Sequence, residues 1–133
     1  MHIPDGFISG PINLACAAVA IAAIAIALAR IRSTLAEHQV PLRPQGPGLI
    51  FHAVMLKPGA AEGPINDYRD YVRRQDAPRW AHLRRCLLEE GVRAIERGLW
   101  SISLAHGEAD IDEALKRAAV AFRRHASTWQ PPA

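Results

Sequence analysis

The chain has 133 residues, the length of one ordinary domain. Half of its residues are hydrophobic, and 16 basic against 13 acidic residues give a net charge of +3, so the composition excludes a disordered chain. Two cysteines are too few for a disulfide scaffold, and the single long apolar run excludes a multi-pass membrane protein.

The first predicted element is a long apolar helix. Residues 14–29 are sixteen uninterrupted apolar positions, and at about 1.5 Å per residue the stretch 12–29 nearly spans a hydrocarbon core of roughly 30 Å. The run favours a transmembrane helix over a cleaved signal peptide or a buried soluble helix. Arg30 and Arg32 follow the run and no Lys or Arg precedes it, so we expect a plasma-membrane protein with its N-terminus outside and its C-terminal region cytoplasmic.

The N-terminus offers a metal chelate. The amine of Met1, the backbone nitrogen of His2 and the His2 imidazole can reach one metal ion, and a planar nitrogen set suits Ni(II), Cu(II) or low-spin Co(II). Binding of this kind releases protons and should weaken at low pH. The alternative is that His2 is an exposed terminal residue without a role, and the spacing alone favours that alternative.

The opening MHIPDGFIS, the Ala-rich run, the Arg-rich exit and EHQVPL resemble the start of CbiM and NikM. These are the substrate-capturing membrane subunits of energy-coupling-factor cobalt and nickel importers. The resemblance covers residues 1–42 and implies that Met1 and His2 are metal ligands, that Co(II) or Ni(II) is the bound substrate ion, and that the membrane and other transporter subunits are partners. After Leu42 the chain departs from the family, because the remaining helices and a Ser-Gly-His motif are missing.

A boundary follows this segment. Residues 41–48, PLRPQGPG, are rich in Pro and Gly, which is typical of a linker or boundary. We therefore expect a membrane-anchored segment at 1–42, a linker at 43–48 and an α+β region at 49–133.

The second region alternates strands and helices. Short apolar or alternating runs predict strands at 49–56, 92–95 and 99–104, and residues 67–74 are expected to be a short helical or irregular piece. Asp76 followed by Pro78 predicts the start of a helix that ends at Gly91. A last helix over 110–125 has its apolar face at Ile111, Leu115, Ala118, Ala119 and Phe122.

The expected fold class is therefore an N-terminal single transmembrane α-helix followed by a small α+β domain, with an antiparallel sheet of about three strands and two helices.

The second half carries its own resemblance. GLIFHAVML, NDYRDY and LLEEGVRAIERGLWSISLAHGEADIDEAL are similar to the end of class III aminotransferases, most of all the glutamate-1-semialdehyde aminomutase branch, over residues 46–126. The resemblance implies the C-terminal part of the small domain of a pyridoxal-phosphate enzyme, whose cofactor lysine lies in a large domain that this chain lacks. Lys57 and Lys116 are not in a cofactor-lysine context. We therefore expect no catalytic residue, no pyridoxal phosphate on this chain alone and no enzymatic activity.

Other patterns are weaker. His106 is expected to be a turn or helix-cap histidine, and Cys86 a packing residue. His82, Cys86 and Glu89 follow helical spacing and in principle bind a metal, although a zinc site needs a fourth partner. The arginines of the second half suit anionic lipid headgroups or a solvated face, and no nucleic-acid motif is present.

Three functional hypotheses remain. The first is a truncated or hybrid membrane component of the cobalt/nickel importer type that captures a divalent transition metal at Met1 and His2. The second is a C-terminal fragment of a class III aminotransferase, inactive alone. The third is a non-functional hybrid. We prefer the first because the atoms that its chemistry needs are present in the chain.

Overall fold

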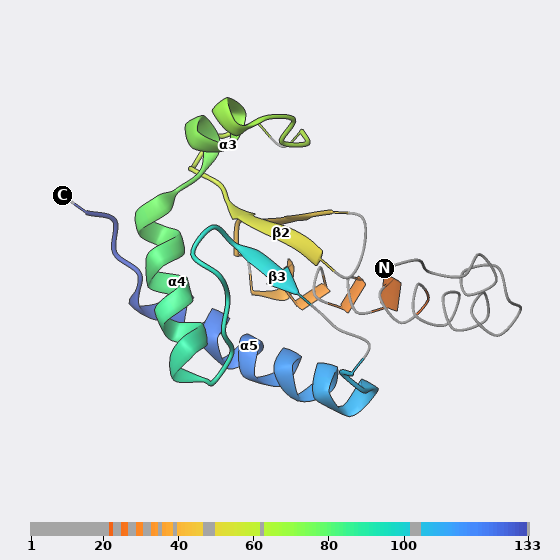
Figure 1. The fold of residues 1–133 in the computed structure, drawn as a ribbon. Helices are drawn as coiled ribbons and strands as arrows, with labels where there is room; N and C mark the ends of the chain where they lie inside the picture. Colours follow the sequence, from red (N-terminus) through yellow and green to blue (C-terminus); the bar gives the residue numbers. More distant parts are fainter. Residues whose placement is uncertain are drawn as a thin grey trace, which may run out of the picture.

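The structure is a computed structural model that describes residues 22, 25, 26, 29, 30, 33, 34, 36–38, 40–46, 50–61, 63–101 and 105–132. Figure 1 shows a small sheet with the blue C-terminal helix below it and the light-green helix above it in this view. The elements in chain order are β1 (Leu42–Gln45), β2 (Ile50–Met55), α3 (Tyr68–Arg74), α4 (Ala77–Glu89), β3 (Leu99–Ser101) and α5 (Glu108–Thr128). The described positions between residues 22 and 37 are helical as well.

The sheet is antiparallel, with the strand order β1-β2-β3. Leu42 lies opposite Met55, and Phe51 lies opposite Trp100. Side chains alternate between the two faces of a strand, so every second residue of β2 enters the core. These core residues of β2 are 1–2% exposed: Phe51, Ala53 and Met55.

Helices α4 and α5 supply the other layer of the core, and they pack against each other beside the sheet (Figure 1). Their inward faces follow helical spacing, which explains why two amphipathic helices and one sheet face close a single core. The buried residues on these faces are Leu83, Cys86 and Leu87 of α4 with Ala118, Ala121 and Phe122 of α5.

Local signals determine where α4 begins and ends. The Asp76 carboxylate accepts a hydrogen bond from the backbone N–H of Arg79 at 3.1 Å, which satisfies one of the open donors of the first turn. Pro78 lies in that turn, where its missing N–H costs nothing. Gly91 follows the helix with φ of 78°, a conformation that favours glycine. The expected start and end of this helix are confirmed.

Arg74, at the end of α3, holds the preceding loop in place through hydrogen bonds. Its guanidinium donates to the carbonyl oxygens of Pro64 at 3.0 Å and Gly63 at 2.5 Å, and also to that of Ala61. It forms an ion pair with Asp70 at 2.8 Å, and the residue is 8% exposed. The Arg74 guanidinium also holds the pKa of the Asp70 carboxyl below its ordinary value. One buried side chain therefore organises the segment between β2 and α3.

The expected fold class is corrected in its first part. Among the described residues, no helix combines the length and the apolar character needed to cross a membrane. The helical positions that are described after Ala29 include polar residues, and Arg30 forms an ion pair with Asp112 of α5. Residues 12–21 of the predicted apolar run lie outside the described residues. What the structure describes is a small α+β domain with three helices rather than two, and it fits only the second half of the expectation.

Two local expectations also differ from the structure. Strand β1 occupies residues 42–45, which overlap the expected linker. A proline is tolerated in this strand because Pro44 lies at the edge of the described sheet, where its missing N–H breaks no hydrogen bond to β2. Pro44 lies opposite Ala53, and the N–H of Ala53 donates to Gly98 on the β3 side, so the backbone of Pro44 faces away from β2. The division into domains stays a prediction.

The second difference is at residues 92–95, which form no strand in the structure. Val92 and Ala94 are buried while Arg93 and Ile95 are exposed, so the predicted alternation is present. However, the N–H of Val92 donates to Leu87 at the end of α4, and no described strand runs beside the segment. Alternating apolar and polar residues predict which face of an extended segment is buried, but they do not predict whether another strand pairs with it.

Candidate functional site

The predicted metal ligands Met1 and His2 lie outside the described residues, and the side chains considered as a site belong to the part of the chain that the structure describes. The next histidines along the sequence are engaged elsewhere. The ring of His38 lies 6.4 Å from that of Phe122, and Nε2 of His52 contacts the carbonyl oxygen of Arg97.

A cluster of polar and aromatic side chains lies where α4 meets α5, with His125 buried and its partners half-buried or exposed. Nδ1 of His82 on α4 and Nδ1 of His125 on α5 are 2.9 Å apart. Nε of Arg79 lies 3.4 Å from Nε2 of His125, and Oγ1 of Thr128 lies 3.4 Å from Nε2 of His82. The ring of Trp129 stacks on His125 with a centroid distance of 5.9 Å and meets His82 edge-on at 5.4 Å.

The donors and acceptors of this cluster allow one consistent assignment. Arg79 can only donate, so Nε2 of His125 accepts and its Nδ1 carries the proton. That proton is donated to Nδ1 of His82, whose Nε2 then donates to the Thr128 hydroxyl, and the hydroxyl donates to the carbonyl oxygen of Arg124 at 2.6 Å. Both imidazoles are neutral in this chain of hydrogen bonds.

The surroundings of His125 keep it neutral. Burial lowers the pKa of His125 to about 4, and the electrostatic influence of His82 and Arg79 acts in the same direction, against that of Asp76. The residue is 1% exposed. A second proton on His125 would therefore have almost no water to stabilise it, and the attraction of the Asp76 carboxylate is smaller than the opposing effect of burial.

The predicted trio of His82, Cys86 and Glu89 does not converge on one point. Sγ of Cys86 is 3.9 Å from Nδ1 of His82, but the Glu89 carboxylate pairs with Arg124 at 2.8 Å. Within the described ranges, no group of three His, Cys, Asp or Glu side chains is placed to hold a metal ion. Cys86 is 4% exposed in the core, and burial raises the pKa of its thiol, so the expectation of a packing residue is confirmed.

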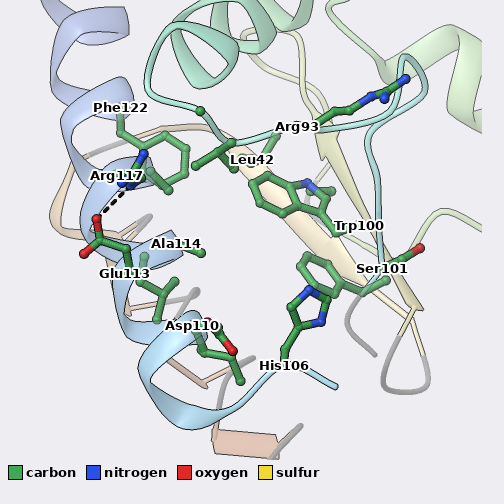
Figure 2. Close-up of a pocket in the computed structure, with 17 residues that line it drawn as sticks. Leu42, Arg93, Trp100, Ser101, His106, Asp110, Glu113, Ala114, Arg117 and Phe122 are labelled. Atoms are coloured by element: carbon green, nitrogen blue, oxygen red, sulfur yellow. Dashed lines mark hydrogen bonds and ion pairs between the residues drawn. The ribbon is translucent and has the colours of Figure 1, made fainter. Parts of the chain in front are cut away.

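A cavity of about 360 Å³ separates the sheet from α5 (Figure 2). Trp100 stacks on Phe51 at 5.8 Å on the sheet side, and Phe122 and Ala118 line the helix side. His106 lines the mouth one residue before Gly107, the N-cap of α5, which is close to its expected role as a turn or cap residue. Figure 2 shows Glu113 and Arg117 paired along the rim of the helix.

Sequence reasoning missed His125, Arg79 and Trp129. One signal was available, because His125 lies three residues after Phe122 and so continues the apolar face of the last helix. That His82 faces it follows only from the way in which α4 and α5 pack.

The first half of the chain matches a known family. A family model described as "Cobalt uptake substrate-specific transmembrane region" matches residues 2–66. No curated protein matches the chain.

The fold resembles solved transaminases. A beta-phenylalanine aminotransferase from Variovorax paradoxus has a TM-score of 0.66 at 22% sequence identity, over 83% of this chain and 24% of that one. An omega-transaminase from Sphaerobacter thermophilus has a TM-score of 0.64 at 18% identity, over 81% of this chain and 24% of that one. The chain thus spans about a quarter of the length of these structures, and the likeness concerns the fold.

The two matches together exceed the length of the chain, so some residues belong to both matches. Both expected resemblances are confirmed. Residues 2–66 are similar to the cobalt-uptake transmembrane family, and the fold is similar to that of a segment of these transaminases.

Proposed function

We propose that the chain is a hybrid component related to the substrate-binding subunit of cobalt and nickel importers, and that it captures a divalent transition metal at its N-terminus. The observation that carries this proposal is the family match over residues 2–66. Its cargo is Co(II) or Ni(II), its ligands are Met1 and His2, and it works at the plasma membrane with other energy-coupling-factor subunits.

The chemistry of the N-terminus supports the proposal. An α-amine, a deprotonated backbone nitrogen and an imidazole form fused chelate rings around one ion, and nitrogen donors in a plane suit Ni(II) and low-spin Co(II). The ligands must lose protons before they bind. Affinity for the ion therefore falls as the pH falls through the range in which the amine and the imidazole titrate.

The test measures Ni(II) and Co(II) binding to the purified full chain by calorimetry and absorbance. We expect one ion per chain, proton release on binding, and loss of binding both in a chain with an acetylated N-terminus and in His2→Ala. His106→Ala is the matched control and should bind as the unmodified chain does. Equal binding by the unmodified, acetylated and His2→Ala chains would contradict the proposal.

A second function is favoured by the fold alone. The likeness to transaminases over 83% of the chain, with a TM-score of 0.66, supports a domain derived from such an enzyme. We propose that this domain is inactive by itself and acts by packing on another chain. Class III aminotransferases use pyridoxal phosphate, held as a Schiff base by a lysine.

The residues present do not fit that cofactor. Nζ of Lys57 donates to the carbonyl oxygen of Arg73 at 3.1 Å on an exposed loop, and Lys116 is exposed on α5. Neither lysine lines the cavity beside α5. Mixing the chain with a separately produced transaminase large domain, and following cofactor absorbance, tests the second proposal: absorbance that appears only in the mixture supports it, and none in the mixture contradicts it.

A further inference from the structure

A basic groove lies on the outer side of α4, away from the cluster at His125. Its volume is about 620 Å³, and it is bounded by α4 and by the extended segment 93–96. Leu88 and Ile95 form its apolar part, and they are 62% and 50% exposed. Both side chains present apolar area within the same groove, which a bound ligand would cover.

Three arginines surround these aliphatic side chains: Arg84, Arg85 and Arg93. None of them forms an ion pair or a side-chain hydrogen bond in the described part of the chain. Arg74, Arg117 and Arg124, by contrast, each pair with a carboxylate. Glu96 is the one acidic residue that lines the groove, so the groove carries an excess of positive charge.

The wall of the groove is fixed in place. Nε1 of Trp80 on α4 donates to the carbonyl oxygen of Glu96 at 2.6 Å, and the N–H of Val92 donates to Leu87 at 2.8 Å. Ala94 is 7% exposed and anchors the middle of the segment in the core. A ligand would therefore meet a preformed surface and would not have to order it.

We propose that this groove docks an acidic segment of a partner protein. An aliphatic side chain of that segment would lie between Leu88 and Ile95, and its Asp or Glu carboxylates would pair with the arginines. The planar guanidinium group matches a carboxylate with two parallel hydrogen bonds, so three unpaired arginines favour a carboxylate-bearing ligand. The proposal does not depend on metal capture.

Two other occupants fit less well. A second copy of the chain would bring the same basic groove and a net charge of +3, which repels. A membrane of anionic lipids is flat, whereas the groove is hollow and lined by Glu96 as well as by the aliphatic pair.

The probe is a fluorescein-labelled helical peptide of twelve residues, with Leu at positions one turn apart and Glu beside them. Its binding to the full chain is measured by fluorescence anisotropy. We expect saturable binding that weakens with salt, and a loss of affinity of at least roughly tenfold in Arg84→Glu and in Arg93→Glu. Leu88→Ser should weaken binding as well, and Arg123→Glu, an exposed arginine of α5, should leave it unchanged.

Three results would overturn the proposal. The first is no binding of the peptide, or equal binding by the unmodified chain and Arg93→Glu. The second is binding to phosphatidylglycerol vesicles through the same arginines, unaffected by Leu88→Ser, without binding of the peptide. The third is self-association that Leu88→Ser abolishes, measured by analytical ultracentrifugation. Circular dichroism of each variant confirms that it is folded.

Discussion

Gly98 shows how a single residue controls the approach of two strands. Its φ is 82°, and its carbonyl oxygen accepts from the N–H of Ala53 at 2.8 Å. A Cβ atom at this position would lie 2.2 Å from the carbonyl oxygen of Ala53, which belongs to the backbone of β2 and cannot swing aside. Position 98 therefore requires glycine for both its conformation and its space.

We predict that Gly98→Ala lowers the free energy of unfolding by at least about 2 kcal/mol, because backbone strain and overpacking add. Urea denaturation followed by circular dichroism measures the change. Gly59→Ala is the control, since Gly59 also has a positive φ, of 74°, but nothing lies within 4 Å of its Cβ position. Equal losses in the two variants would contradict the steric part of the argument.

Individual residues show which part of the candidate site can be predicted from the sequence and which part cannot. The expectation that Cys86 is a packing residue within a helix is confirmed, because its side chain is buried in the core. The pair of His82 and His125 was not found, because 43 residues separate them and their contact depends on packing between two helices. Met1 and His2 stay predictions, since they lie outside the described residues.

Elements were predictable to the extent that their signals are local. Asp76, Pro78 and Gly91 mark the ends of α4 within the chain itself, and the apolar spacing of α5 gives its inward face. Strands depend on partners far away in the sequence. The alternation at 92–95 was therefore mistaken for a strand, and β1 was overlooked because of its proline.

The segment between β2 and α3 depends on one ion-paired residue, and this gives a prediction at the scale of elements. Arg74→Ala removes donors from three carbonyl oxygens and from Asp70, and should lower the free energy of unfolding by about 2–4 kcal/mol. Hydrogen exchange in residues 60–67 should also become faster.

Arg73→Ala is the matched control. Its side chain is 76% exposed and also pairs with Asp70, at 3.1 Å. An exposed pair contributes little, so we expect this change to be small. Similar exchange rates in Arg73→Ala and Arg74→Ala would show that burial of Arg74 is not what holds the loop.

For the whole molecule, the buried histidine couples stability to pH. The pKa of His125 is about 4 in the folded chain and returns to about 6.5 on unfolding. Between these values the unfolded chain binds a proton that the folded chain does not. The free energy of unfolding should therefore fall as the pH falls from about 6.5 to about 4, by up to about 3 kcal/mol, and this contribution should be constant above that window.

Urea denaturation across pH 4 to 8 measures this dependence. His125→Gln should be less stable at neutral pH and should lose most of the slope, whereas His106→Gln, at an exposed position, should keep it. An unchanged slope in His125→Gln would assign the dependence to other groups.

The edge of the sheet has a consequence for the behaviour of the chain at high concentration. Strand β1 is paired only with β2 among the described strands, so within the described part of the chain its outer side is an edge of the sheet. The unpaired N–H and C=O groups of such an edge can pair with a strand of a neighbouring molecule, and repeated pairing of this kind builds fibrils. The backbone of Pro44 faces that outer side and has no N–H group. A strand added at this edge would therefore lack one backbone hydrogen bond. The proline that hides β1 in the sequence therefore disfavours the addition of a strand from another molecule, which is a step in aggregation.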